Sequence, residues 1–211
     1  MLFIFILTSL LSIRSDDSGS DALRLETRCE TSVAKTGYDV GEKQSFSANM
    51  LVATPEGNKP IEQLAVGAAV LSFNPETGQI ETTTIEAVTT QHRHNMYELY
   101  FEGIKIKVTE DQPFYSQGKY YSVVKNKKHG VSTKALSIGQ VFDFLINDDM
   151  VKVTLKQIRP FNTCENTVTI TKLAKNNLYF ANGACVLTGT SSAGEEESHH
   201  PAGVNTLLQN E

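Results

Sequence analysis

The chain has 211 residues, of which 40% are hydrophobic and 20% are charged, and its formal net charge is -5. Such a chain fits one packed domain with flanking segments, and its composition excludes disorder throughout. The acidic balance argues against binding along a nucleic-acid backbone, which requires a basic surface. The basic cluster at residues 125–129 (KNKKH) contains no aromatic residue, so we expect it at a solvated hairpin tip.

Residues 1–13 form an apolar run, MLFIFILTSLLSI, which is followed by Arg14. A membrane-spanning helix needs about 20 such residues, so this run is too short to cross a bilayer. Its length is typical of a secretory signal peptide, and we predict that residues 1–15 are removed as the protein is secreted. An uncleaved signal anchor and an N-terminal strand or helix of the core are the alternatives.

The flanking segments are polar. Residues 16–44 lack a sustained periodicity, which predicts a linker or short N-terminal peptide with at most one helical turn at 21–25. The end of the chain is rich in Ser, Gly, Glu and His, so we expect residues 190–211 to form a disordered tail. The domain itself is therefore placed at residues 45–189.

Within the domain, short β-type runs are separated by turn signals such as Pro75 and Gly78. Residues 104–108 read IKIKV, an alternation that buries one face of a strand and exposes the other. Residues 59–64 are expected to form a short helical turn or loop. The expected strands cover 51–53, 69–73, 79–90, 97–101, 104–108, 114–115, 120–123, 151–158, 167–173 and 178–187. Without a long amphipathic helix or an internal repeat, this pattern predicts an all-β, partly closed antiparallel body.

The chain contains three cysteines, Cys29, Cys164 and Cys185. In a secreted protein the odd count indicates one disulfide and one remaining thiol, and the sequence does not say which two cysteines pair. No two of them have C-x-x-C spacing, and the His199–His200 pair stands alone. We therefore predict no metal site and no cofactor.

One stretch carries an ordered set of chemical features. Residues 45–71 (SFSANMLVATPEGNKPIEQLAVGAAVL) begin with a hydroxyl nucleophile, Ser45, and continue through a strand, an acidic–glycine turn and spaced apolar positions. The later positions of this pattern are Glu56, Gly57, Ile61, Leu64, Gly67, Val70 and Leu71. The order resembles the opening block of the Hint family, the self-cleaving fold shared by hedgehog autoprocessing domains and inteins.

Three later segments follow in the order of the same family. Residues 108–115 (VTEDQPFY) resemble its VTxDHPF motif, with Gln112 in the place of the histidine. Residues 132–141 resemble its A..L..G..L segment, and residues 179–183 (YFANG) resemble its FFANG segment. The resemblance covers about residues 45–188 and implies a flattened horseshoe of antiparallel β-hairpins.

The resemblance also implies autocatalytic cleavage, with the chain's own N-terminal segment as the substrate. The Ser45 hydroxyl would attack the carbonyl carbon of Gln44, and water, a thiol or a sterol would then resolve the resulting ester. Thr109 would help to hold the strained amide. Neither an external substrate nor a cofactor is expected.

Gln112 is the main departure from the family pattern. A carboxamide donates hydrogen bonds but does not transfer a proton near neutral pH, and general acid–base help is typically worth ~10²–10⁴-fold. We therefore expect cleavage to be weakened or lost. Asp111 is the neighbouring candidate, although strand alternation is expected to turn it to the opposite face. His92 and His94 are alternative proton donors, expected at partly exposed positions on a preceding strand.

Leu187 and Thr188 stand where the terminal His and Asn of an intein would lie. Without that Asn the chain is not expected to ligate its flanking segments, which leaves cleavage without splicing. A rival hypothesis comes from a different class of protein: a non-catalytic, secreted β-domain that acts as an interaction or structural module.

Overall fold

The computed structural model describes residues 44–94, 96–128, 131–161 and 163–189. The predicted signal peptide, the N-terminal segment up to residue 43 and the C-terminal tail lie outside the described residues. Within the described ranges the chain contains strands and one 3-10 turn but no α-helix. No helix in this part of the chain is long and apolar enough to cross a membrane. The all-β prediction is confirmed.

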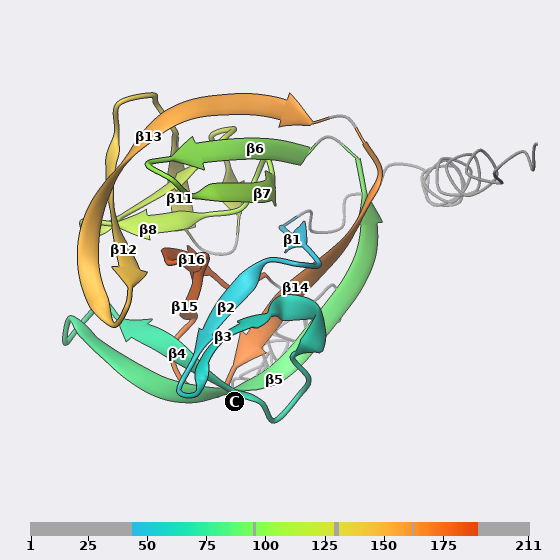
Figure 1. The fold of residues 1–211 in the computed structure, drawn as a ribbon, viewed down its shortest axis with the longest axis vertical. Coiled ribbons are helices and arrows are strands. Elements are labelled where there is room, and N and C mark those ends of the chain that lie inside the picture. The colour runs from blue at the N-terminus through green and yellow to red at the C-terminus, as the bar shows by residue number, and fades with distance from the viewer. Residues whose placement is uncertain (1–43, 95, 129–130, 162, 190–211) are drawn as a thin grey trace, which may run out of the picture.

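The strands form one large sheet (Figure 1). The first eight are β1 (Phe46–Ser47), β2 (Leu51–Thr54), β3 (Gly57–Pro60), β4 (Ala69–Asn74), β5 (Gln79–Arg93), β6 (Met96–Phe101), β7 (Lys105–Thr109) and β8 (Phe114–Ser116). The others are β9 (Lys119–Ser122), β10 (Lys127–Lys128), β11 (Val131–Ala135), β12 (Val141–Ile146), β13 (Asp149–Phe161), β14 (Glu165–Leu173), β15 (Leu178–Ala181) and β16 (Ala184–Leu187). The 3-10 turn η1 (Ile61–Gln63) follows β3.

The sheet closes on itself. In the order β16-β12-β13-β6-β7-β1-β14-β5-β4-β15 each strand is hydrogen-bonded to the next, and β15 also pairs with β16. The long strands β5 and β13 curve around the outside of the molecule, while β1, β2, β15 and β16 lie inside that curve (Figure 1). Register shifts in β13 and β14 mark β-bulges, which bend a strand and increase its twist. The pairings are antiparallel except for β9 with β11.

Two predicted segments differ from the structure. Residues 178–187 form two strands rather than one, because Asn182 and Gly183 take positive φ angles of 44° and 83° and make a tight hairpin turn. Residues 59–64 are only partly a turn, since β3 extends to Pro60 before η1 begins. Strand β12 was not expected from the sequence, and it pairs with β13 through a turn at Asn147–Asp148.

Strand β1 is the shortest strand of the closed ring. Strand β1 lies between β7 and β14, with Phe46 paired to Val108 on one side and to Val168 on the other. The Phe46 ring is fully buried and meets the Tyr179 ring edge to face, with 6.4 Å between centroids. This insertion places Ser45, the residue before β1, beside the end of β7 and the middle of β14.

The β15–β16 turn generates the first prediction. A Cβ atom on Gly183 would lie 2.8 Å from the Leu145 carbonyl oxygen, whereas a Cβ on Gly103 would meet nothing within 4 Å. Both glycines have positive φ, so alanine at either position should cost about 1–2 kcal/mol of unfolding free energy. Gly183→Ala should cost a further ~1–3 kcal/mol because the steric overlap must also be relieved. Urea denaturation measures the difference, and an equal loss in the two variants would contradict this account.

Candidate functional site

The peptide bond between Gln44 and Ser45 is buried, and both residues are only 2% exposed. The Ser45 N–H donates to Thr109 Oγ1 at 3.0 Å, and the Thr109 N–H donates to the Ser45 carbonyl oxygen at 3.1 Å. Thr109 ends β7, so the strand pairing described above brings the two residues together across 64 positions of sequence. The contact between Ser45 and Thr109 on which the expected role of Thr109 depends is therefore present, and the Gln112 backbone is hydrogen-bonded to Thr109.

A third residue, Thr169 of β14, was not identified from the sequence. Its Oγ1 donates to the Gln44 carbonyl oxygen at 2.6 Å and lies 2.8 Å from Ser45 Oγ. A carbonyl oxygen only accepts and a hydroxyl has one proton, so Ser45 must donate to Thr169 in this arrangement. One threonine thus contacts both Ser45 Oγ and the carbonyl oxygen of the Gln44–Ser45 peptide bond. Threonine is an ordinary strand residue, so only the β1–β14 register reveals it.

Gln112 lies near this site, but its side chain is engaged elsewhere. Its backbone N–H donates to the Thr109 carbonyl oxygen at 3.4 Å, which keeps the two residues together. Its buried Nε2 donates to the Leu187 carbonyl oxygen at 2.7 Å and to the Pro113 carbonyl oxygen at 3.3 Å. The amide therefore ties the turn after β7 to the end of β16.

The other candidate residues occupy different surroundings. Asp111 is buried, but it sits in the turn that follows β7, so the strand-alternation argument for its direction does not apply. Its backbone carbonyl accepts a hydrogen bond from Asn126 Nδ2 at 3.1 Å. His92 lies in β5 opposite Asn166 and is partly buried, while His94 is exposed. Within the described residues, neither imidazole is hydrogen-bonded to Gln44 or Ser45.

The side chain of Gln44 is unusual. Its Oε1 and Nε2 atoms are buried, and neither has a hydrogen-bond partner among the described residues. A buried polar group left without a partner costs about 1–3 kcal/mol. The residue before Ser45 is therefore held in an unfavourable environment while the peptide bond is intact.

At the other end of β1, a polar network connects the strand to its neighbours. The Ser47 hydroxyl donates to one carboxylate oxygen of Glu165, and Lys107 Nζ binds the other. The Lys107 ammonium also lies 4.2 Å from the centre of the Phe161 ring. Since the three polar residues belong to β1, β14 and β7, the network connects the same strands that hold Ser45.

The C-terminal end of the domain returns to this site. Leu187 and Thr188 donate their backbone N–H groups to Pro113 and Asn177. The Gly189 N–H donates to Ile170 at 2.9 Å, which brings this glycine against β14. No group of three or more metal-ligating side chains occurs among the described residues.

The packing of Gly189 generates the second prediction. A Cβ there would lie 2.4 Å from Thr169 Cγ2, so Gly189→Ala must displace Thr169. We expect a loss of about 1–3 kcal/mol in unfolding free energy, as for other overpacked sites. Thr169→Ser keeps the hydroxyl but removes Cγ2, so Gly189→Ala should cost less in that background. A double-mutant cycle in urea measures this coupling, and strictly additive losses would contradict the contact.

No protein-family model matches the sequence, and no curated protein matches it. Solved structures match the fold. A bacterial intein-like domain from Clostridium thermocellum aligns with a TM-score of 0.56 at 19% identity, covering 69% of this chain and 99% of that chain. The Ssp DnaB mini-intein variant M86 aligns with a TM-score of 0.60 at 13% identity, covering 74% and 99%. The gp41-1 intein aligns with a TM-score of 0.51 at 21% identity, covering 70% and 99%.

These structures are similar to this chain over almost their whole length. At such low identity the similarity establishes the fold. The domain therefore has the Hint fold of inteins, as its sequence blocks predict.

Proposed function

We propose that this domain cleaves its own chain at Gln44–Ser45 by an N–O acyl shift. The observation that carries the proposal is the Thr169 hydroxyl, which contacts both Ser45 Oγ and the Gln44 carbonyl oxygen in a buried site. A hydrogen-bond donor fixed on the carbonyl oxygen is what an acyl transfer requires as negative charge develops there.

In the proposed step, Ser45 Oγ bonds to the carbonyl carbon of Gln44. The carbonyl oxygen gains negative charge against the Thr169 hydroxyl. The bond from that carbon to the Ser45 nitrogen then breaks, and the proton lost by Oγ ends on this nitrogen. The product is an ester between Gln44 and Ser45 with a free amine, so the shift needs no co-reactant.

Proton transfer is the weak part of this arrangement. Thr109 Oγ1, the group bound to the Ser45 nitrogen, is a hydroxyl rather than an imidazole. The Gln112 amide is tied to Leu187 and in any case transfers no proton near neutral pH. Loss of general acid help typically costs ~10²–10⁴-fold, so we infer slow cleavage.

The buried environment of Gln44, in contrast, favours cleavage. Cleavage followed by departure of the N-terminal segment would return to water the Gln44 side-chain amide, which is buried without a hydrogen-bond partner among the described residues. The cost of its burial, about 1–3 kcal/mol, would then be recovered. The intact bond is thus the state that this site destabilises.

Resolution of the ester completes the proposed function. Water, a thiol or a sterol would attack the Gln44 carbonyl carbon and release the N-terminal segment. Leu187 and Thr188 supply no Asn for ligation, so no new peptide bond joins the two products. The apolar run at residues 1–13 supports export of the chain, which would place this reaction on a secreted protein.

The test uses hydroxylamine, which traps the ester as a hydroxamate. The full chain should yield a fragment that begins at Ser45, and Ser45→Ala should yield none. Thr169→Val should slow its formation by about 10²–10³-fold, the usual effect of losing one such donor. Thr171→Val, in the same strand, is the matched control and should cleave at nearly the original rate. If Thr169→Val and Thr171→Val cleave equally, the hydroxyl contact is not used.

The fourth prediction concerns Gln112→His. An imidazole near Thr109 can deliver a proton to the departing nitrogen, so cleavage should rise toward the ~10²–10⁴-fold that general acid help provides. The gain should be largest below pH about 6.5 and should fade as pH rises through that value, because the protonated imidazole is the acid. Gln112→Met, which has similar reach and no transferable proton, should show no gain. Hydroxylamine incubation for a day, followed by mass spectrometry, measures both.

The alternative function, a non-catalytic β-module, is favoured by one observation. The Gln112 side chain bridges β16 and the turn after β7, a structural role that does not depend on cleavage. If Gln112→His gives no hydroxylamine-dependent fragment, the defect extends beyond this residue and the module becomes the better interpretation.

A further inference from the structure

The three cysteines of the chain have different states. Cys164, just before β14, is in a disulfide. Cys185, in β16, is a free thiol. Cys29 lies outside the described residues, on the opposite side of the Gln44–Ser45 bond from the other two.

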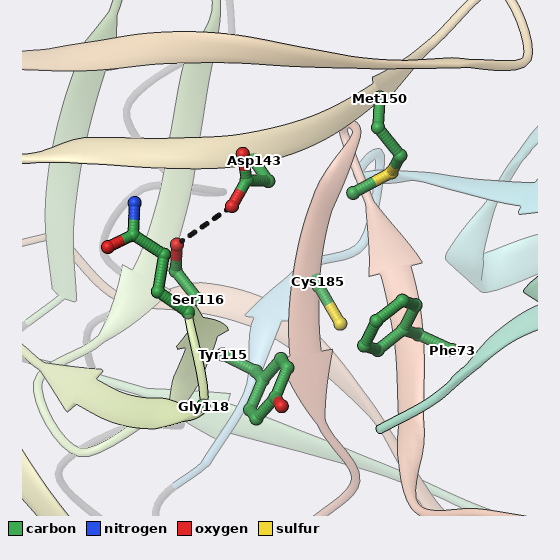
Figure 2. A pocket seen from close by; sticks show the side chains of 8 residues that line it. Phe73, Tyr115, Ser116, Gly118, Asp143, Met150 and Cys185 are labelled. Carbon is green, nitrogen blue, oxygen red and sulfur yellow. Dashed lines mark hydrogen bonds between the residues drawn. The ribbon is translucent and has the colours of Figure 1, made fainter. Parts of the chain in front are cut away.

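Cys185 is not available to pair with another cysteine. Its side chain lines a pocket of about 260 Å³ together with Phe73, Tyr115 and Met150. Figure 2 shows its sulfur between the Phe73 and Tyr115 rings. Burial raises the pKa of the Cys185 thiol, which keeps it protonated and unreactive toward disulfides. Cys29 is thus the remaining partner for Cys164 within one chain.

We propose that a Cys29–Cys164 disulfide spans the cleavage site, so that the N-terminal segment stays attached after the peptide bond is cut and leaves only after reduction. This inference rests on the proposed cleavage at Gln44–Ser45. Two covalent links would then join the segment to the domain, and each is removed by different chemistry.

The geometry of β14 is compatible with this connection. Cys164 and Thr169 are five positions apart on the chain, or about 17 Å along a strand. The segment from Cys29 to Gln44 covers 15 steps and reaches up to about 50 Å when extended. The segment between Cys29 and Gln44 is therefore long enough for strand β14 to contact the Gln44 carbonyl through Thr169 and to hold the disulfide through Cys164.

The reductive step needs an external reductant, for which we specify a dithiol. One of its thiolates attacks a sulfur of the disulfide, and the mixed disulfide is then resolved by its second thiolate. Cys29 and Cys164 each gain an electron and a proton, while the dithiol is oxidised to its own disulfide. A thiol compound could also resolve the ester, so one class of molecule would perform both releases.

Peptide mapping tests the disulfide without any cleavage reaction. The full chain is oxidised in a glutathione buffer, alkylated and digested with trypsin. A linked pair of peptides, 29–35 (CETSVAK) and 157–172 (QIRPFNTCENTVTITK), is expected. Alkylated Cys164, or Cys164 linked to a second copy of itself in a dimer, would overturn the proposal.

A gel experiment tests the release. The oxidised chain is treated with hydroxylamine, with or without a phosphine reductant, and analysed under denaturing conditions without thiols. The fragments should separate only in the presence of the phosphine. In Cys29→Ser they should separate without it, while the matched control Cys185→Ser should behave as the original chain.

The failures of the two proposals are distinguishable. A linked peptide pair with no fragment under any condition would disprove the cleavage, and with it a role for the disulfide in release. Fragments that separate without the phosphine would leave the cleavage standing and overturn the tether.

Discussion

The structure depends on the double pairing of a two-residue strand. Strand β1 is too short to be stable alone, and it is held by β7 and β14 on its two sides and by the burial of Phe46. The peptide group before it, Gln44–Ser45, is buried and must have its N–H and carbonyl groups paired. Hydroxyl groups of Thr109 and Thr169, rather than backbone groups, supply those partners. At this peptide bond, side-chain hydroxyl groups thus take the place of the backbone hydrogen bonds of the β-ladder. The same contacts complete the fold and polarise the Gln44–Ser45 peptide group.

Because the partners of this peptide group are threonine hydroxyl groups, proton transfer at the site is limited. A threonine hydroxyl orients and polarises its partners, but it does not exchange protons readily near neutral pH. Gln112, which stands at the histidine position of the VTxDHPF motif, uses its amide to join the turn after β7 to Leu187. Its hydrogen bond stabilises the end of β16. Residue 112 therefore has a structural role at a position where the reaction would require a proton donor. Under the proposed function, this site would have the contacts for attack by Ser45 and would lack a group that speeds departure of the nitrogen.

Much of this arrangement could be predicted from the sequence, and the exceptions have physical causes. The alternation in residues 104–108 and the turn signals around Gly78 and Gly103 located β4 to β7 closely, because one face of those strands is wet. The β15–β16 hairpin was predicted as one strand because all of its strand residues are buried, which removes the period-2 pattern. The order of the segments that resemble the Hint family indicated that Ser45 and Thr109 lie close together. Thr169 could not be found in this way, since its role depends on the register of β1 against β14 and not on a motif.

The two ends of the domain meet at Thr169, but they are held in different ways. On the N-terminal side, the Gln44 side-chain amide is buried and has no hydrogen-bond partner among the described residues. On the C-terminal side, the backbone N–H groups of Leu187, Thr188 and Gly189 are all hydrogen-bonded. Gly189 packs so closely on Thr169 that a methyl group would not fit. The C-terminal end therefore packs against the side chain of Thr169, whose hydroxyl contacts the buried Gln44–Ser45 peptide. Under the proposed function, this arrangement would favour cleavage at Gln44–Ser45 alone, because Gly189, at the end that ligation would require to react, is packed against Thr169.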